Sequence, residues 1–131
     1  MLINIKWYKK INFEEEENMP FIQLKTTKEL NTVTKETLNT ELLTITKQCL
    51  GKGENWVMTS FEENASMYFQ GSSEDIAYVE VKAYGEPSKA GTNKMTAQVC
   101  QLMEKELQIP ANRVYVSYFS TNHWGWNGEN F

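Results

Sequence analysis

Two stretches decide the fold of this chain: residues 50–61 read LGKGENWVMTSF, and residues 107–118 read LQIPANRVYVSY. They align without gaps when Leu50 is placed on Leu107. Self-similarity at a fixed offset indicates a duplicated structural unit. The matched pairs are Leu50 with Leu107, Asn55 with Asn112, Val57 with Val114, Ser60 with Ser117, and Phe61 with Tyr118.

The same offset relates two expected helices. One helical face, with the spacing i, i+4, i+7 and i+11, is formed by Leu38, Leu42, Ile45 and Cys49. The second copy nearly repeats this spacing, at Met95, Val99, Leu102 and Glu106. Both helices are followed by stop signals, which are Gly51 and Gly53 in the first copy and Pro110 in the second.

Each expected helix has an expected strand on either side. Residues 21–26 and 76–83 precede the helices and are rich in the β-branched and aromatic residues of half-buried strands. Residues 56–61 and 113–119 follow the helices and close the units. Each copy therefore predicts the order strand, helix, strand.

The predicted fold class is α+β, an α/β sandwich of duplicated βαβ units at about residues 20–64 and 77–121. Right-handed crossovers then give a four-stranded sheet with two helices on one face. The strands hold more aromatic residues than two helices can cover, so we expect the other face to pack against other subunits. These residues are Trp56, Phe61, Tyr78, Tyr115 and Phe119.

Composition limits the classes of partner. The chain has 131 residues, of which 40% are hydrophobic, and this is enough apolar surface for one small domain. Its net charge of −4 disfavours a dedicated nucleic-acid binder, because a phosphate backbone attracts a basic surface. No stretch approaches the roughly 20 apolar residues that span a bilayer. We expect a small molecule or another protein as partner, with no nucleic acid and no membrane.

The two cysteines, Cys49 and Cys100, lie in the helical patterns and show no CxxC or Cys/His ligand spacing. We expect buried free thiols rather than a disulfide, as in an intracellular protein. A structural zinc site is not expected, because only His123 could add a nitrogen ligand. The sequence therefore predicts no metal.

Residues 1–18 differ from the rest of the chain, with three Lys ahead of four consecutive Glu. Their apolar residues are too interrupted for a secretory signal peptide. We expect this extension to be untranslated or disordered, ahead of a single domain at residues 19–131. The expected location is the cytoplasm, with secretion by a non-classical route as the open alternative.

Four further motifs are distinctive: Met-Pro-Phe-Ile at 19–22, Phe-Gln-Gly-Ser-Ser-Glu at 69–74, Ile-Pro-Ala-Asn-Arg-Val-Tyr at 109–115, and Trp-Gly-Trp-Asn-Gly at 124–128 with a final Phe131. In order and spacing they resemble the macrophage migration inhibitory factor (MIF) family of the tautomerase superfamily. The resemblance covers residues 19–131 and implies a homotrimer of duplicated units around a central sheet barrel, with three active sites at subunit boundaries. It also implies a cofactor-free keto–enol tautomerase.

By this resemblance, Pro20 is the catalytic residue. A free N-terminal proline is a secondary amine, and α-amino groups titrate at about 7.7 to 8.0. An apolar pocket and a nearby cation lower that pKa, so that the amine serves as a base near neutral pH. This chemistry requires that Met19 and the residues before it are absent, because an internal Pro20 is an amide without a basic nitrogen.

The resemblance implies four substrate-binding residues. Lys52 would bind a substrate carboxylate and lower the pKa of Pro20, although a lysine between glycines is also typical of an exposed loop. The backbone amide of Tyr84 would contact the same carboxylate. Tyr115 and Ser117 would come from the neighbouring subunit, Tyr115 with its hydroxyl and ring, and Ser117 in place of a common asparagine.

An aromatic pocket wall is implied too, and it favours phenylpyruvate-like or dopachrome-like substrates. The alternative for these side chains is ordinary trimer packing. The segment at 123–128 fits a hairpin that tucks Trp into a groove as well as a wall of the pocket, since one residue can do both. The expected wall residues are Phe21, Trp56, Trp124, Trp126 and Phe131.

Two other functions stay open. One is a MIF-like cytokine or receptor-binding protein in which catalysis is vestigial, and the other is a ligand-sensing βαβ regulatory domain. Thiol–disulfide chemistry is not expected, because Ile76 and Val79 occupy the positions where some family members carry a CxxC. For His123 we expect a surface or packing role rather than general-acid catalysis.

Overall fold

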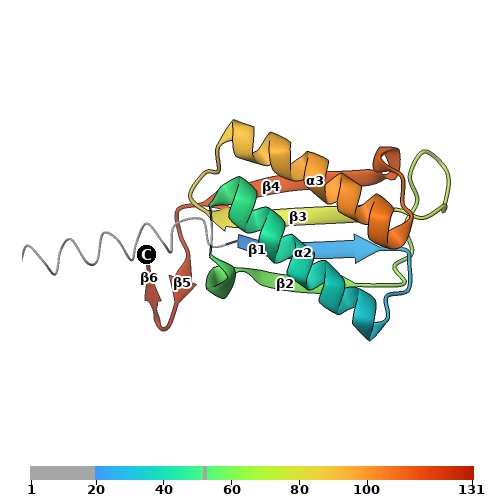
Figure 1. The fold of residues 1–131 in the computed structure, drawn as a ribbon. Coiled ribbons are helices and arrows are strands. Elements are labelled where there is room, and N and C mark those ends of the chain that lie inside the picture. Colours follow the sequence, from blue (N-terminus) through green and yellow to red (C-terminus); the bar gives the residue numbers. More distant parts are fainter. Residues whose placement is uncertain (1–19, 52) are drawn as a thin grey trace, which may run out of the picture.

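The computed structural model describes residues 20–51 and 53–131, in which two helices cover one face of a four-stranded sheet (Figure 1). A short C-terminal hairpin extends beyond one end of the sheet. The elements are β1 (Pro20–Thr26), α2 (Thr32–Leu50), η1 (Glu54–Trp56), β2 (Met58–Glu62), β3 (Ala77–Tyr84), α3 (Lys89–Leu107), η2 (Ala111–Arg113), β4 (Val114–Thr121), β5 (Gly125–Trp126) and β6 (Glu129–Asn130), where η denotes a 3-10 turn.

The duplication predicted from the sequence is confirmed in the fold. At the offset that places Leu50 on Leu107, both ends of α2 coincide with those of α3, and the turn η1 coincides with η2. In each unit the two strands pair in parallel, β1 with β2 and β3 with β4. The two units are joined by antiparallel pairing of β1 with β3, which gives the order β2-β1-β3-β4.

The strands β2 and β4 begin later than expected, for the same reason in both units. Trp56 and Arg113 were expected to begin strands, but each is the last residue of a 3-10 turn. The strands start afterwards, at Met58 and Val114. These turns redirect the chain from the helix end to the sheet, so that Trp56 lies beside the sheet rather than in it.

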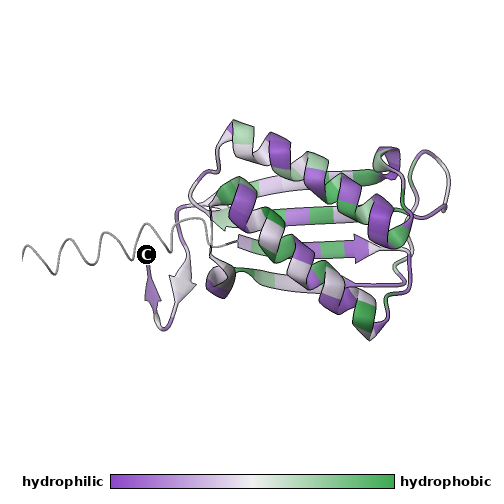
Figure 2. Ribbon diagram, viewed as in Figure 1, coloured by the Kyte–Doolittle hydropathy of each residue, from purple (hydrophilic) through white to green (hydrophobic). Residues whose placement is uncertain are grey.

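The core lies between the helices and the sheet. Side chains of β1 alternate between buried and half-buried, with Ile22 and Leu24 completely buried on the helix side. Figure 2 shows the corresponding alternation of hydrophobic and hydrophilic residues along the strands. Helices α2 and α3 contribute Leu38, Leu42, Met95 and Val99, all completely buried.

We call the opposite face of the sheet the open face; it is formed by Phe21, Gln23, Lys25, Met58, Ser60, Glu62, Tyr78, Glu80, Lys82, Tyr115, Ser117 and Phe119. Three apolar side chains on this face are largely exposed: Met58 at 66%, Tyr115 at 62% and Phe119 at 50%. One part of the expectation is wrong, because Phe61 is in register with Leu24 and packs against the core on the helix side.

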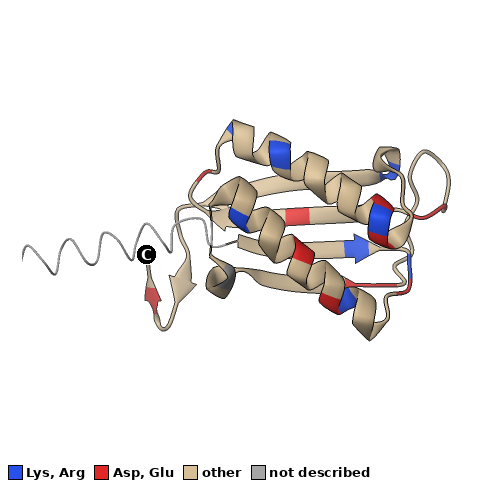
Figure 3. Cartoon of the chain, in the orientation of Figure 1, with Lys and Arg blue, Asp and Glu red and all other residues tan. Residues whose placement is uncertain are grey.

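Helices α2 and α3 each carry both acidic and basic residues (Figure 3). The helix surface therefore has charges of both signs close together, which does not favour binding to a polyanion. None of the helices described is both long and apolar enough to span a membrane.

Candidate active site

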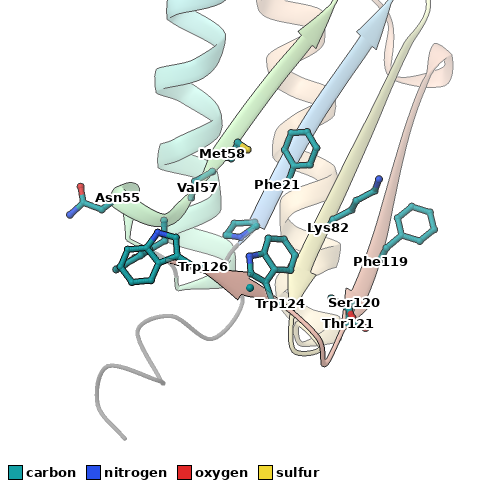
Figure 4. Close-up of a pocket in the computed structure, with 13 residues that line it drawn as sticks. Phe21, Asn55, Val57, Met58, Lys82, Phe119, Ser120, Thr121, Trp124 and Trp126 are labelled. Carbon is teal, nitrogen blue, oxygen red and sulfur yellow. The ribbon is translucent and has the colours of Figure 1, made fainter. Parts of the chain in front are cut away.

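A cavity of about 460 Å³ lies at the end of the sheet where β1 begins (Figure 4). Its walls come from the start of β1, the turn η1, the end of β4 and the C-terminal hairpin. Most of the lining is apolar and much of it is aromatic. The lining residues are Pro20, Phe21, Asn55, Trp56, Val57, Met58, Lys82, Phe119, Ser120, Thr121, Trp124, Gly125 and Trp126.

Pro20 is the first residue of β1 and is buried in the cavity wall. Its Cα pairs with that of Ala83 on the antiparallel strand β3. Proline is tolerated at the first residue of a strand, since it has no N–H for the ladder. The strand therefore holds the Pro20 ring at the cavity, which is where the proposed chemistry would need it.

The tail hairpin carries two of the expected wall residues, Trp124 and Trp126. Its turn contains Asn127 and Gly128 with φ of 54° and 83°, the positive values that an Asn-Gly hairpin turn adopts. The ring of Trp126 packs edge-on against Trp56, with centroids 4.9 Å apart and planes at 85°. Both interpretations of this segment therefore hold, because the hairpin tucks a Trp against η1 and also lines the cavity.

Tyr84 and Phe131 lie together but outside the cavity lining. Their ring centroids are 5.6 Å apart, and the backbone N–H of Phe131 donates to the carbonyl oxygen of Trp124 at 3.0 Å. The ring contact with Tyr84 of β3 fastens the end of the hairpin to the sheet. Lys52, the expected carboxylate-binding residue, lies outside the described residues.

Tyr115 and Ser117 are not at this cavity. Tyr115 is in register with Tyr78, five residues along β3 from the partner of Pro20, a separation of about 17 Å at the usual rise per residue. The ring of Tyr115 contacts Phe69, at 5.1 Å between centroids. The Ser117 hydroxyl lies 2.8 Å from that of Tyr78. Both residues face outward on the open face, so only another molecule could bring them to a Pro20 cavity.

The sequence reasoning missed several lining residues, among which Lys82 is the only charged one in the described part of the chain. Lys82 is in register with Phe21 through the antiparallel pairing of β1 with β3. The internal repeat predicts pairing inside each unit but not between the units, so it carried no signal for this neighbour. The other residues missed are Asn55, Val57, Met58, Phe119, Ser120, Thr121 and Gly125.

The cysteines take no part in the cavity. Cys49 and Cys100 are free thiols and are half-buried rather than fully buried. Burial raises the pKa of both thiols, which makes them poorer nucleophiles at neutral pH. His123 is exposed, and its backbone N–H donates to the Thr121 hydroxyl at 3.1 Å. Within residues 20–51 and 53–131, no group of three potential metal ligands comes together.

Comparisons with known proteins agree with the observed fold. The family model for macrophage migration inhibitory factor matches residues 19–131. The crystal structure of Leishmania major MIF2 is 39% identical, covers 88% of this chain and 99% of its own, and superposes with a TM-score of 0.84. A homologue from Prochlorococcus marinus is 34% identical, covers 85% and 98%, and has a TM-score of 0.77.

A similar result comes from sequence alone. Macrophage migration inhibitory factor of Xenopus laevis is 29% identical over 98 residues, which are 73% of this chain and 85% of the relative. The family match includes the segment that begins at Met19 and Pro20 and ends with the aromatic hairpin. The chain belongs to the macrophage migration inhibitory factor family, within the tautomerase superfamily.

Proposed function

We propose that this protein is a cofactor-free keto–enol tautomerase that acts on phenylpyruvate-like or dopachrome-like substrates, with Pro20 as the general base. The observation that carries the proposal is the position of Pro20, the first residue of β1, in the wall of an aromatic cavity. Membership of the MIF family supports a tautomerase or cytokine-like function in general terms.

The reaction needs a basic nitrogen on Pro20, and therefore a chain whose first residue is Pro20. In an apolar cavity the charged form of the amine is disfavoured, which lowers its pKa toward neutral. The amine takes a proton from the carbon beside the substrate ketone, and the electron pair moves to the carbonyl oxygen. Return of the proton to that oxygen gives the enol, and the reverse sequence gives the ketone.

The cavity wall suits a flat aromatic substrate. Phe21 approaches from β1, and Trp124 and Trp126 from the hairpin (Figure 4). Trp56, the last residue of η1, also lines the cavity. Edge-on and offset contacts of such rings with an aryl group add to the free energy of burial. By the family resemblance, Lys52 and the backbone amide of Tyr84 would hold the substrate carboxylate beside this wall. Phe131 would support the wall from behind.

We propose further that the protein is a homotrimer with its sites at subunit boundaries. The supporting observations are the exposed apolar side chains of the open face and the distance of Tyr115 and Ser117 from the cavity of their own protomer. A large exposed apolar surface favours association. Sedimentation at micromolar concentration should show a trimer, and a monomer would contradict shared sites.

Ketonisation of phenylpyruvate by protein that begins at Pro20 tests the proposed reaction. Pro20→Gly replaces the secondary amine with a primary one and removes the ring, and we expect kcat/KM to fall about 100-fold, within the usual contribution of a positioned base. Pro87→Gly is the matched control, because Pro87 lies in the loop before α3 and not in the cavity.

The same assay distinguishes catalysis from the alternative, a receptor-binding function. Protein that retains residues 1–19 should be inactive, since Pro20 is then an amide. Equal rates for Pro20→Gly and the parent protein would reject Pro20 as the base. A folded trimer that begins at Pro20 and has no activity would favour the receptor-binding function instead.

A further inference from the structure

Tyr78 makes a hydrogen bond with Ser117, one of the two residues that the family resemblance assigns to the site of a neighbouring subunit. The two hydroxyl oxygens are 2.8 Å apart, and both side chains are half-buried on the open face. The register partner of Tyr78 on β4 is Tyr115, two residues before Ser117. An aromatic side chain can reach such a diagonal neighbour across paired strands. Tyr78 therefore lies beside Tyr115 and is linked to Ser117.

Tyr115, the other of these two residues, is supported from the segment between β2 and β3. Its ring contacts that of Phe69, with centroids 5.1 Å apart and planes at 65°. The guanidinium carbon of Arg113 lies 5.5 Å from the centroid of the Phe69 ring. These side chains and Tyr78 line a cavity of about 160 Å³. The ring of Tyr115 is therefore held by Phe69, whereas the hydroxyl of Ser117 depends on Tyr78.

The hydrogen bond between Tyr78 and Ser117 changes what the serine can offer to a ligand. A serine hydroxyl without a partner rotates freely, so its hydrogen has no fixed direction. In the pair one hydroxyl donates to the other, and one hydrogen remains for a third group. Among the described residues, neither hydroxyl has another hydrogen-bond partner. Because linked hydrogen bonds polarise one another, the pair presents a directed and strengthened donor on the open face.

We propose that Tyr78 is a positioning residue of the shared site, which directs the Ser117 hydroxyl toward an oxygen atom of an aromatic acid in the cavity of the neighbouring subunit. This inference rests on the proposed function for the trimer and for the class of substrate. Neither Tyr78 nor Ser117 lines the cavity of its own protomer. A second copy of the chain must therefore bring the cavity and the hydroxyl pair together.

4-Hydroxycinnamate tests the binding step without any reaction, because this flat aromatic acid has oxygen atoms at both ends and no keto group. Calorimetric titration of protein that begins at Pro20 gives its Kd. We expect Ser117→Ala to raise the Kd about tenfold and Tyr78→Phe about fivefold, as for loss or weakening of one hydrogen bond. In the Ser117→Ala background, Tyr78→Phe should change the Kd less than about twofold, because Tyr78 acts through Ser117.

Tyr118→Phe is the matched control. The hydroxyl of Tyr118 also lies 2.8 Å from another hydroxyl, that of Thr96, but Tyr118 packs against the core on the helix side and does not line the cavity of Pro20. Its loss should leave the Kd of 4-hydroxycinnamate unchanged. Equal rises in Kd for Tyr78→Phe and Tyr118→Phe would overturn the proposal, because loss of any tyrosine hydroxyl would then explain them. Additive effects of Tyr78→Phe and Ser117→Ala would overturn it too, since Tyr78 would then act independently of Ser117.

Turnover of 4-hydroxyphenylpyruvate provides the second arm. Tyr78→Phe should lower kcat/KM about fivefold, mainly through KM, because the pair holds the substrate and the transition state alike. A loss confined to kcat would contradict the assignment. Sedimentation of the parent protein identifies a failure of the shared site, since a monomer would overturn that site and this inference together. If Pro20→Gly keeps the parent rate, the proposed base fails, while the titrations still decide the role of Tyr78.

Discussion

The turns η1 and η2 occupy equivalent positions in the two repeat units, yet their last residues have different surroundings. Trp56 ends η1, and its ring packs edge-on against Trp126 in the cavity wall. Arg113 ends η2 at the equivalent position and is only 8% exposed. Its guanidinium group donates to the backbone carbonyl oxygens of Phe69, Ser72, Glu74 and Asp75, at 2.9 to 3.2 Å.

This difference shows that equivalent residues in the two copies of a duplicated unit can take different roles. The segment between β2 and β3 has no regular strand pairing of its own beyond one bridge, and Arg113 fastens it to the second unit. At the other end of the sheet, the equivalent Trp56 contributes to a cavity. The first strands differ in degree, since Pro20 lines this cavity of about 460 Å³, whereas the equivalent Ala77 lines, with Arg113, a smaller one of about 160 Å³. We infer that η1 contributes a wall residue to the cavity, whereas the equivalent turn η2 supports the fold.

Arg113→Met should have the largest effect on stability. It removes four hydrogen bonds from a charged donor and leaves backbone carbonyl oxygens with fewer partners, so we expect the free energy of unfolding to fall by about 3 kcal/mol. Urea unfolding at one fixed protein concentration measures it, because association also contributes to stability. The free energy of unfolding of Arg113→Lys should lie between those of the parent protein and Arg113→Met, because an ammonium group has fewer donors than a guanidinium group. A loss below about 1 kcal/mol would contradict the supporting role of Arg113.

Trp56→Ala should affect activity more than stability. Loss of the edge-on contact with Trp126 costs about 1 kcal/mol of stability, while the cavity loses one wall. We expect kcat/KM for phenylpyruvate to fall about tenfold, as when a central aromatic contact is truncated. Trp56→Phe keeps a ring and should restore most of that activity. If Trp56→Ala destabilised the protein as much as Arg113→Met, the proposed division between the two turns would be wrong.

The internal repeat explains why much of the fold could be predicted from the sequence. Parallel pairing within a unit follows from the order strand, helix, strand, which both copies share. The pairing of β1 with β3 could not be predicted in this way, because it joins different units and depends on how two finished units pack. Trp56 was assigned to a strand because its residue type fits one, whereas the geometry of the chain after α2 requires a turn there.

The candidate site was predictable to the extent that its residues belong to recognisable motifs. Pro20, Phe21, Trp56, Trp124 and Trp126 do meet at one cavity. Lys82 could not be found, because a lysine on an alternating strand reads as an ordinary solvent-facing residue. Its place in the wall comes from two long-range register partners, Phe21 and Phe119. Contacts that depend on pairing between units leave no local pattern in the sequence.

The smallest expected effects are at the ends of the helices, where the two units again differ at equivalent positions. Gly51 and Gln108 end α2 and α3 with φ of 72° and 57°, a left-handed conformation that glycine adopts without strain. A Cβ added at Gly51 would meet nothing within 4 Å, so the cost of Gly51→Ala, about 1 kcal/mol, would come from the backbone alone.

Gln108→Gly should stabilise the protein, because it relieves the same backbone strain in the second unit. Part of the gain is offset by the lost hydrogen bond from Nε2 of Gln108 to the carbonyl oxygen of Lys105, at 3.3 Å. We therefore expect a net stabilisation of about 0.5 kcal/mol, measured beside Gly51→Ala in the same urea titration. If Gln108→Gly gains stability and Gly51→Ala loses it, the backbone conformation, rather than the residues around each helix end, determines the change in stability. If both variants lost stability equally, Gln108 would contribute more through its side chain than it costs in backbone strain, and the two helix ends would not be equivalent.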